Sequence, residues 1–225
     1  MKFNQLVNYK IVCAFLFLFG FYHSIYSNAG ILFWAVNKKG EPLALLYKKA
    51  EFPNYNVIGG KTAKWNDSKK FTAVTNTAEE TNGFLGCWVY LLKRIENLDK
   101  KYIVKSFLPG ARTPFVTYWL KVDYFSVCNL YKWNGKQNHF VWIKFSELIN
   151  VMLKKPDANC FKDYYVCEGY PNKDKIYLHY LFIKGLLKGR NLYGQPTIEI
   201  IQKTILQFSN DSKKNSRFSF FSNPI

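Results

Sequence analysis

The sequence predicts a single domain of mixed α/β class (α+β). Short apolar runs rich in β-branched and aromatic residues dominate the first two thirds of the chain, and one helix pattern interrupts them after the second run. Helix patterns then prevail in the last third, an order typical of this class. The chain has 225 residues, of which 48% are hydrophobic, and this is ample for one core.

The first two strands are expected at residues 30–36 (GILFWAV) and 42–49 (PLALLYKK). Both runs are apolar, and the turn-like NKKGE between them predicts a β-hairpin. A loop, a short apolar piece and the pair Gly59-Gly60 follow. Adjacent glycines permit backbone conformations that other residues avoid, so we expect a specialised loop there.

The segment DSKKFTAVTNTAEETNG is expected to form a helix. Asp67 or Ser68 can cap its start, and Asn82 or Gly83 can end it in a left-handed conformation. Three apolar residues at helical spacing predict the face that packs on the core: Phe71, Val74 and Ala78.

The rest of the chain supplies more strands and then helices. Four segments are predicted as strands: 85–95, 101–109, 113–125 and 138–145. Three segments are predicted as helices: 146–155, 175–189 and 196–208. The last of these carries an amphipathic stripe, made of Ile198, Ile201, Ile205 and Phe208.

The domain boundaries follow from these elements. We expect a first domain over residues 30–155 and a helical extension over 156–208 that packs on the same domain. The extension begins with an irregular, cysteine-containing loop at 156–174, and residues 209–225 are polar and predicted to be a flexible, frayed tail.

Residues 1–29 have the three parts of a secretory signal peptide. A basic start precedes the apolar run IVCAFLFLFGFY, and small residues follow at Ser27 and Ala29. This pattern predicts export to a secreted or periplasmic location, with cleavage before Gly30 or, as the other option, after Ser27. The alternative is a retained membrane anchor, because residues 11–36 contain no Asp, Glu, Lys or Arg.

Four cysteines remain after such cleavage: Cys87, Cys128, Cys160 and Cys167. An even number in an exported protein favours disulfides, and three connectivities are open. One of them closes a local loop between Cys160 and Cys167 and pairs Cys87 with Cys128. The alternative is four unpaired thiols.

The formal net charge of +17 favours anionic partners. Nucleotide-type small molecules, nucleic acid, acidic lipid and acidic polymers all fit, and a lysine-rich surface without one dedicated partner fits as well. The run YLHYLFIKGLLKGRNLYG interleaves aromatic residues with cations, as single-strand nucleic-acid binders do. The same run also fits a core helix whose lysines reach out to solvent.

Asn76, Glu79 and Glu80 share one face of the predicted helix, because residues three and four apart are neighbours on a helix. Acids near a helix C-terminus oppose the helix dipole and favour a cation beside them. That cation is either a metal ion or a lysine such as Lys61 or Lys64. The alternative is an ordinary solvated acidic surface.

Taken in order, strand, turn, strand, the VIGGK segment and a helix ending in AEETNG resemble the Nudix hydrolase family. The segments TPFVTYWLKVD and FVWIKFSEL extend the resemblance over residues 30–155. It implies a mixed sheet sandwiched between helices, and Mg²⁺ (or Mn²⁺) held by the helix against a pyrophosphate. It makes Glu79, Glu80 and Asn76 metal-ligand candidates, adds Asp67 as a catalytic candidate, and assigns phosphate contacts to Gly59, Gly60 and Lys61.

The match departs from the family signature. Thr75 stands where the family has arginine and Asn76 where it has glutamate, and six residues rather than five separate Gly60 from Asp67. A neutral amide binds Mg²⁺ less well than a carboxylate does. The missing arginine removes a group that would hold the carboxylates in place. The motif is therefore degenerate, and the sequence leaves open whether catalysis survives.

Three functions remain open from the sequence. The first is a Mg²⁺-dependent hydrolase of nucleoside-diphosphate-linked (pyrophosphate) substrates with weakened activity. The second is a catalytically inactive Nudix-fold protein that binds a nucleotide, a protein or an anionic surface. The third is a basic nucleic-acid binder, whose affinity would fall steeply with salt.

Overall fold

The structure is a computed structural model that describes residues 28–49, 52, 54–61, 68–107, 113–134, 139–153, 164–171 and 174–218. Side chains at 131–134, 164–167, 180 and 209–218 are not described. Residues 1–27 of the predicted signal peptide therefore lie outside the described residues, and so do Asp67, Lys64 and Cys160.

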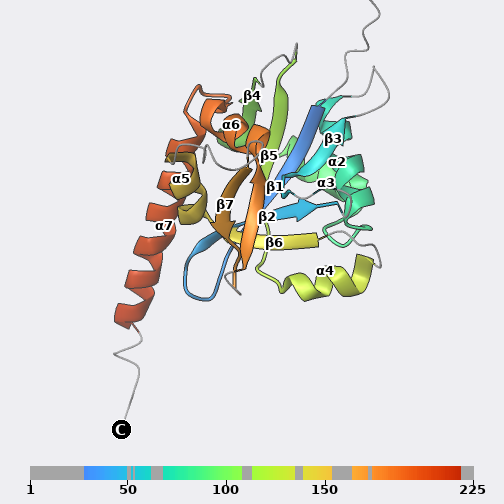
Figure 1. The fold of residues 1–225 in the computed structure, drawn as a ribbon. Coiled ribbons are helices and arrows are strands. Elements are labelled where there is room, and N and C mark those ends of the chain that lie inside the picture. The colour runs from blue at the N-terminus through green and yellow to red at the C-terminus, as the bar shows by residue number, and fades with distance from the viewer. Residues whose placement is uncertain are drawn as a thin grey trace, which may run out of the picture.

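A mixed sheet forms the centre of the molecule (Figure 1). Its strands lie in the order β6-β2-β1-β5-β4-β9, and β3 pairs with β1 on the same edge as β2. β1 and β5 are parallel, whereas the other neighbouring pairs are antiparallel. The strands are β1 (Asn28–Val36), β2 (Pro42–Lys48), β3 (Ile58–Lys61), β4 (Ile103–Ser106), β5 (Phe115–Lys121), β6 (His139–Lys144) and β9 (Arg190–Asn191).

β1 is a central strand, and every residue in it except the first and the last is buried. One edge pairs with β5 from Ala29 to Trp34. The other edge is divided, because β3 pairs with residues 28–31 and β2 with residues 33–36. A strand that is covered on both faces needs a continuous apolar sequence, and GILFWAV has one. The predicted hairpin of β1 and β2 is confirmed.

Helices cover both faces of the sheet (Figure 1). Ile31 and Phe33 of β1 face one core, which α2 and α3 cover, while Leu32 and Trp34 face the other, which α5, α6 and α7 cover. This alternation is the two-residue period of a strand. The predicted mixed sheet between helices is confirmed. The helices are α2 (Lys69–Glu80), α3 (Trp88–Glu96), α4 (Val127–Asn134), α5 (Phe145–Leu153), α6 (Tyr180–Lys188) and α7 (Thr197–Phe218), with a short 3₁₀ turn, η1, at Lys100–Tyr102.

The segment 85–95, predicted as a strand, is instead mostly the helix α3. Its buried residues are Leu91 and Ile95, four apart, while the three residues that begin the helix are exposed. The strand prediction was wrong because it gave weight to aromatic and β-branched content. The spacing of Leu91 and Ile95 was the better signal, since it places both side chains on one helical face.

The region after α5 also differs from the prediction. β7 (Tyr164–Glu168) and β8 (Lys175–His179) form a second, two-stranded antiparallel sheet, where the sequence predicted a loop and the start of a helix. β8 alternates exposed and buried residues, a period-2 pattern that the helix prediction overlooked. His179 then caps α6, because its Nδ1 accepts a hydrogen bond from the backbone N–H of Leu181 at 3.1 Å.

Three more elements differ from the prediction. The helix α4 and the two-residue strand β9 were not expected, and β9 adds to the main sheet beside β4. The helix α7 continues to Phe218, so residues 209–218 are helical rather than a frayed tail. Its predicted apolar stripe is confirmed, since Ile201 is fully buried and Ile198, Ile205 and Phe208 pack against the same core.

Cys87 and Cys128 are exposed free thiols in this structure, so the option that pairs them with each other is wrong. The pairing of Cys160 and Cys167 lies outside the described side chains and stays a prediction. In the described part of the chain, none of the helices combines the length and the hydropathy of a membrane span.

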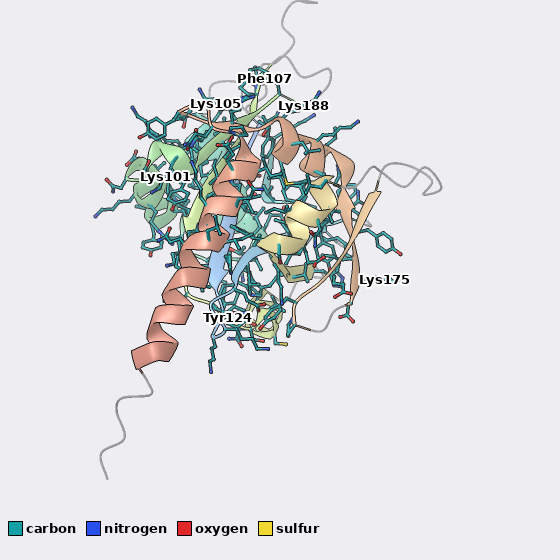
Figure 2. All side chains as sticks on the ribbon, turned by 90° about the vertical axis from the view of Figure 1, so that its left-hand side faces the viewer. Lys101, Lys105, Phe107, Tyr124, Lys175 and Lys188 are labelled. Carbon is teal, nitrogen blue, oxygen red and sulfur yellow. The ribbon has the colours of Figure 1, made fainter. Side chains whose placement is uncertain are left out.

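Exposed cations gather near the β4–β9 edge of the sheet. Figure 2 shows Lys101, Lys105 and Lys188 projecting from this part of the molecule. Lys105 lies opposite Arg190 in the ladder between β4 and β9, a like-charge pair that weakens strand pairing. Burial, and then the nearby charge of Lys105, lowers the pKa of Lys69. A positive field at this edge attracts anions.

We expect Tyr118 to make the fold sensitive to alkaline pH. Tyr118 is buried in the core under α2 and α3, and burial raises its pKa from 10.0 to about 12. The unfolded chain loses this proton near pH 10, whereas the folded protein keeps it to about pH 12. The contribution of the neutral phenol to stability is therefore full below pH 10 and is lost as the pH rises towards 12.

Denaturant unfolding at stepped pH, for the wild type and for Tyr118→Phe, measures this effect. As the pH rises from 10 to 12, the free energy of unfolding should fall more steeply for the wild type than for Tyr118→Phe. Parallel pH profiles for the two proteins would contradict the prediction.

Candidate functional site

The helix α2 carries the acidic candidates that the sequence singled out. It begins after Ser68, whose Oγ accepts a hydrogen bond from the backbone N–H of Phe71 at 3.1 Å. It ends at Glu80, and positive φ angles at Asn82 (48°) and Gly83 (75°) turn the chain away. Ser68 as cap and both predicted end residues are therefore confirmed.

The face of α2 that packs on the sheet is only partly the one predicted, because Val74 is buried and Ala78 is half-buried as expected. Phe71 is exposed, and its ring meets that of Trp88 edge-on with centroids 5.8 Å apart. The buried stripe is at helical spacing and consists of Thr72, Ala73, Val74 and Thr77. The prediction left out the two threonines, although small side chains suit a helix packed closely on a sheet.

The three residues of the acidic face have different surroundings. Asn76 is half-buried, and its Nδ2 donates to the carbonyl of Thr72 at 2.9 Å. Glu79 is exposed. The Glu80 carboxylate lies 2.8 Å from the Nζ of Lys49, just beyond the end of β2. A lysine of this chain is thus the cation beside the helix C-terminus, where the dipole favours positive charge.

Gly59 and Gly60 belong to the strand β3 rather than to a loop, and they have different roles. A Cβ on Gly59 would lie 2.4 Å from the Cα of Gly30 and 2.5 Å from the carbonyl oxygen of Ala29. Glycine at 59 is therefore required by the close approach of β3 to β1. A Cβ on Gly60 would meet only the side chain of Asn76, at an ordinary distance of 3.7 Å.

A cavity of about 270 Å³ opens at this end of the sheet, under α6. Its walls are mostly apolar, with polar groups from Asn28, Lys61, Ser106 and Thr117. The hydroxyl of Ser106 is already used, since it donates to the carbonyl of Gly185 at 2.8 Å. The Oδ1 of Asn28 is buried and accepts no hydrogen bond within the described part of the chain. Apolar walls with a few polar groups are typical of small-molecule sites.

The cavity and the acidic face lie on opposite sides of β3. The apolar lining includes Val104 and Phe182, which belong to the core under α6, whereas α2 packs on the other core. Gly60 connects the two, because it lines the cavity while a Cβ on it would point at Asn76. Lys61 also borders the cavity, and its role as a phosphate contact stays a prediction.

Two of the three candidate metal ligands already make contacts within the protein. No group of three or more His, Cys, Asp or Glu side chains comes together anywhere in the described part of the chain. Glu80 is bound to Lys49, and Asn76 turns its NH₂ group to its own helix. Thr75, at the arginine position of the family, donates its hydroxyl to the carbonyl of Phe71 at 2.9 Å and so holds no carboxylate. Asp67 lies outside the described residues, and its role stays a prediction.

Comparisons with known proteins add a similarity of fold. No family model matches the chain, and no curated protein matches it. Among solved structures, the chain is similar to a Nudix hydrolase from M. smegmatis, RenU, at 12% sequence identity and a TM-score of 0.39. The match covers 73% of this chain and 83% of that chain. Similarity at this level establishes neither family membership nor an activity, so the function must be argued from the site.

Two residues of this site, Lys49 and Asn28, were not predicted as site residues from the sequence. Lys49 was taken as the last residue of a strand, and Asn28 as part of the signal peptide. The charge of Lys49 gave no sign that it would meet Glu80, because the contact depends on where β2 ends relative to α2. Asn28 was assigned to the signal peptide, so its place in β1 and the burial of its side-chain oxygen could not be anticipated.

We expect Gly59→Ala and Gly60→Ala to differ sharply in stability. The added methyl at 59 meets backbone atoms of β1 that cannot move aside, so the free energy of unfolding should fall by about 2 kcal/mol or more. The methyl at 60 has room, and its effect should stay within about 0.5 kcal/mol. Urea unfolding of both variants measures this, and equal losses would show that the close approach of β3 to β1 is not what requires glycine.

Proposed function

We propose that this protein is a Nudix-like binding protein for a nucleoside-diphosphate type of molecule, and that its hydrolytic activity is weak or lost. The observation that carries the proposal is the cavity at the end of β3, which Gly60, Lys61 and Asn28 border. An apolar interior suits a base and a ribose, and a lysine at the rim suits phosphate oxygens.

Asn28 gives the cavity a specific polar preference. Its buried Oδ1 lacks a donor among the described residues, and an unsatisfied buried acceptor costs about 1–3 kcal/mol. A ligand that brings an N–H group to this atom removes that cost. The exocyclic amine of an adenine or a cytosine is such a group.

The ion pair of Lys49 with Glu80 is the reason for proposing weak or lost catalysis. It places a positive charge where the family resemblance expects a metal ion, 2.8 Å from the carboxylate. The competing function is the Mg²⁺-dependent pyrophosphohydrolase. The shared face of Asn76, Glu79 and Glu80 beside Gly60 favours it.

A nucleic-acid binder is the third candidate, which the run YLHYLFIKGLLKGRNLYG (177–194) suggested. Within this run Phe182, Ile183 and Leu186 are buried in the core, whereas Tyr177 and Tyr193 are exposed. The run therefore serves at least in part as core with lysines beside it.

We expect ADP-ribose to bind without added metal, in a calorimetric titration of the full chain. Lys61→Gln should weaken this binding several-fold, because the lysine contacts the phosphates in the proposed pose. Lys38→Gln, at the exposed turn between β1 and β2, is the matched control and should leave the affinity unchanged. Absence of binding, or equal loss in both variants, would overturn the proposal.

The same titrations with Mg²⁺ separate the two functions. A binding protein gives no AMP on prolonged incubation, and its affinity survives Glu80→Gln. Release of AMP that requires Mg²⁺ and disappears in Glu80→Gln would establish the hydrolase instead.

We also propose that the protein is exported and processed after Ser27. Asn28 and Ala29 are the first residues of β1, where they pair with Lys61 and Gly60 of β3. Cleavage before Gly30 would remove this pairing and leave a charged amine inside the sheet. N-terminal sequencing of the secreted protein should therefore give Asn28. A mature chain that begins at Gly30 would contradict this.

A further inference from the structure

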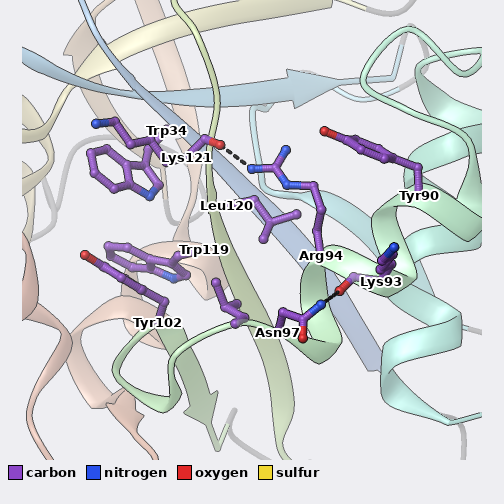
Figure 3. Close-up of a pocket in the computed structure, with 10 residues that line it drawn as sticks. Trp34, Tyr90, Lys93, Arg94, Asn97, Tyr102, Trp119, Leu120 and Lys121 are labelled. Carbon is purple, nitrogen blue, oxygen red and sulfur yellow. Dashed lines mark hydrogen bonds between the residues drawn. The ribbon is translucent and has the colours of Figure 1, made fainter.

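A second cavity opens near the opposite end of β1 and β5, and the proposed function does not use it (Figure 3). Its volume is about 540 Å³. The first cavity contains Asn28 and this one contains Trp34, and six residues of extended strand separate their Cα atoms by about 20 Å. The two cavities are therefore separate places on the fold.

Strand lengths create this opening. β4 begins at Ile103, which pairs with Tyr118 of β5. β4 therefore pairs with no residue of β5 after Tyr118, and residues 119–121 line the cavity. The helix α3 contributes the opposite wall with Tyr90, Lys93 and Arg94, together with its C-cap residue Asn97.

One wall of the cavity is aromatic and held rigidly. The rings of Trp34 and Tyr102 lie 6.2 Å apart, and Trp34 also packs against Phe145 and Phe208. Trp119 packs against Phe145 from the same side, at 5.9 Å. These contacts bury both indoles, so the wall exists before any ligand arrives.

Both tryptophans have a hydrogen-bond donor without an acceptor. Trp34 is 4% exposed and Trp119 is 1% exposed, and the Nε1 of each lacks a partner among the described residues. Figure 3 shows both indole nitrogens on the side of the rings that faces the other lining residues. A buried indole N–H normally finds an acceptor. Trp142 illustrates this, since its Nε1 donates to the carbonyl of Phe125 at 2.9 Å.

The charged groups of the cavity are all cations. Lys93, Arg94 and Lys121 line it, and no Asp or Glu does so among the described residues. Arg94 is held in place, because its Nη2 donates to the carbonyl of Lys121 (Figure 3). The Nζ of Lys121 lies 5.5 Å from the centroid of the Trp34 ring and 4.7 Å from that of Phe208.

We propose that this cavity is a second binding site, for a planar ring that carries a phosphate group. The phosphate oxygens accept hydrogen bonds from the indole N–H groups and neutralise the three cations. The ring stacks on the exposed phenol of Tyr90 or on the half-buried phenol of Tyr102. A doubly charged phosphate fits this lining better than a neutral ring, because three cations without an acid repel one another.

AMP is the probe for this site, titrated calorimetrically into the full chain, with inorganic phosphate and adenosine as the two halves of the ligand. We expect AMP to bind at one site, beside the wall formed by Trp34 and Trp119, and adenosine without the phosphate group to bind there much more weakly. Trp34→Phe and Trp119→Phe keep an aromatic ring and remove the N–H group, and each should weaken AMP binding by about tenfold. Lys121→Gln should weaken it as well and reduce its dependence on salt.

The controls separate this site from the other cavity. Trp142→Phe removes an indole N–H that already has an acceptor outside this cavity, and Lys61→Gln alters the first cavity; both should leave the affinity for this AMP site unchanged. If AMP does not bind, or if Lys61→Gln abolishes its binding while Trp34→Phe and Trp119→Phe do not, the inference is overturned. ADP-ribose contains an AMP unit, so the variants distinguish the two sites: Lys61→Gln affects the ADP-ribose site of the proposed function, whereas Trp34→Phe and Trp119→Phe affect this one.

Discussion

The double coverage of β1 is the constraint on which the rest of the structure depends. This strand pairs with β5 along one edge and with β3 and then β2 along the other, and a core lies on each of its faces. Gly30 and Gly59 allow β3 to approach closely enough to share that edge. Every apolar side chain of β1 is thus committed to packing, and polar chemistry is left to the strand ends.

Both cavities lie at those ends. Asn28 borders the first and Trp34 the second, and each brings a buried polar atom that has no partner within the described residues. Buried polar groups are usually satisfied, and an unsatisfied one beside a cavity is available to a ligand or a water. The surplus of positive charge gives both openings the same preference for anions, whereas the polar groups in them select different ligands.

Much of the fold could be predicted from the sequence, because its strongest signals are periodic. The hairpin of β1 and β2, the helix α2 with its cap at Ser68 and the stripe of α7 all follow from local patterns. The wrong predictions occurred where composition and periodicity indicated different structures. Aromatic content favoured a strand where the helix α3 forms, and the alternating segment KIYLH was predicted as part of a helix although it forms β8.

The candidate site was predictable only in part. The helix face of Asn76, Glu79 and Glu80 follows from spacing, because neighbours on a helix are fixed by its geometry. The partner of Glu80 does not follow from spacing. Lys49 is 31 positions earlier in the chain, and the two meet only because the fold brings the end of β2 near the end of α2. The two indoles of the second cavity come from the parallel strands β1 and β5. The register between these strands cannot be predicted from either local sequence.

The shortness of β4 has a consequence for how the proposed second site arises. Its four residues leave the end of β5 uncovered, so the cavity is a gap in strand pairing rather than a hollow carved from the core. Lengthening β4 by a few residues would close the gap and satisfy the exposed strand edge. The 3₁₀ turn η1 immediately before β4 occupies the positions where those residues would stand. A change in one connecting turn is therefore enough to create or erase a ligand site without disturbing either core.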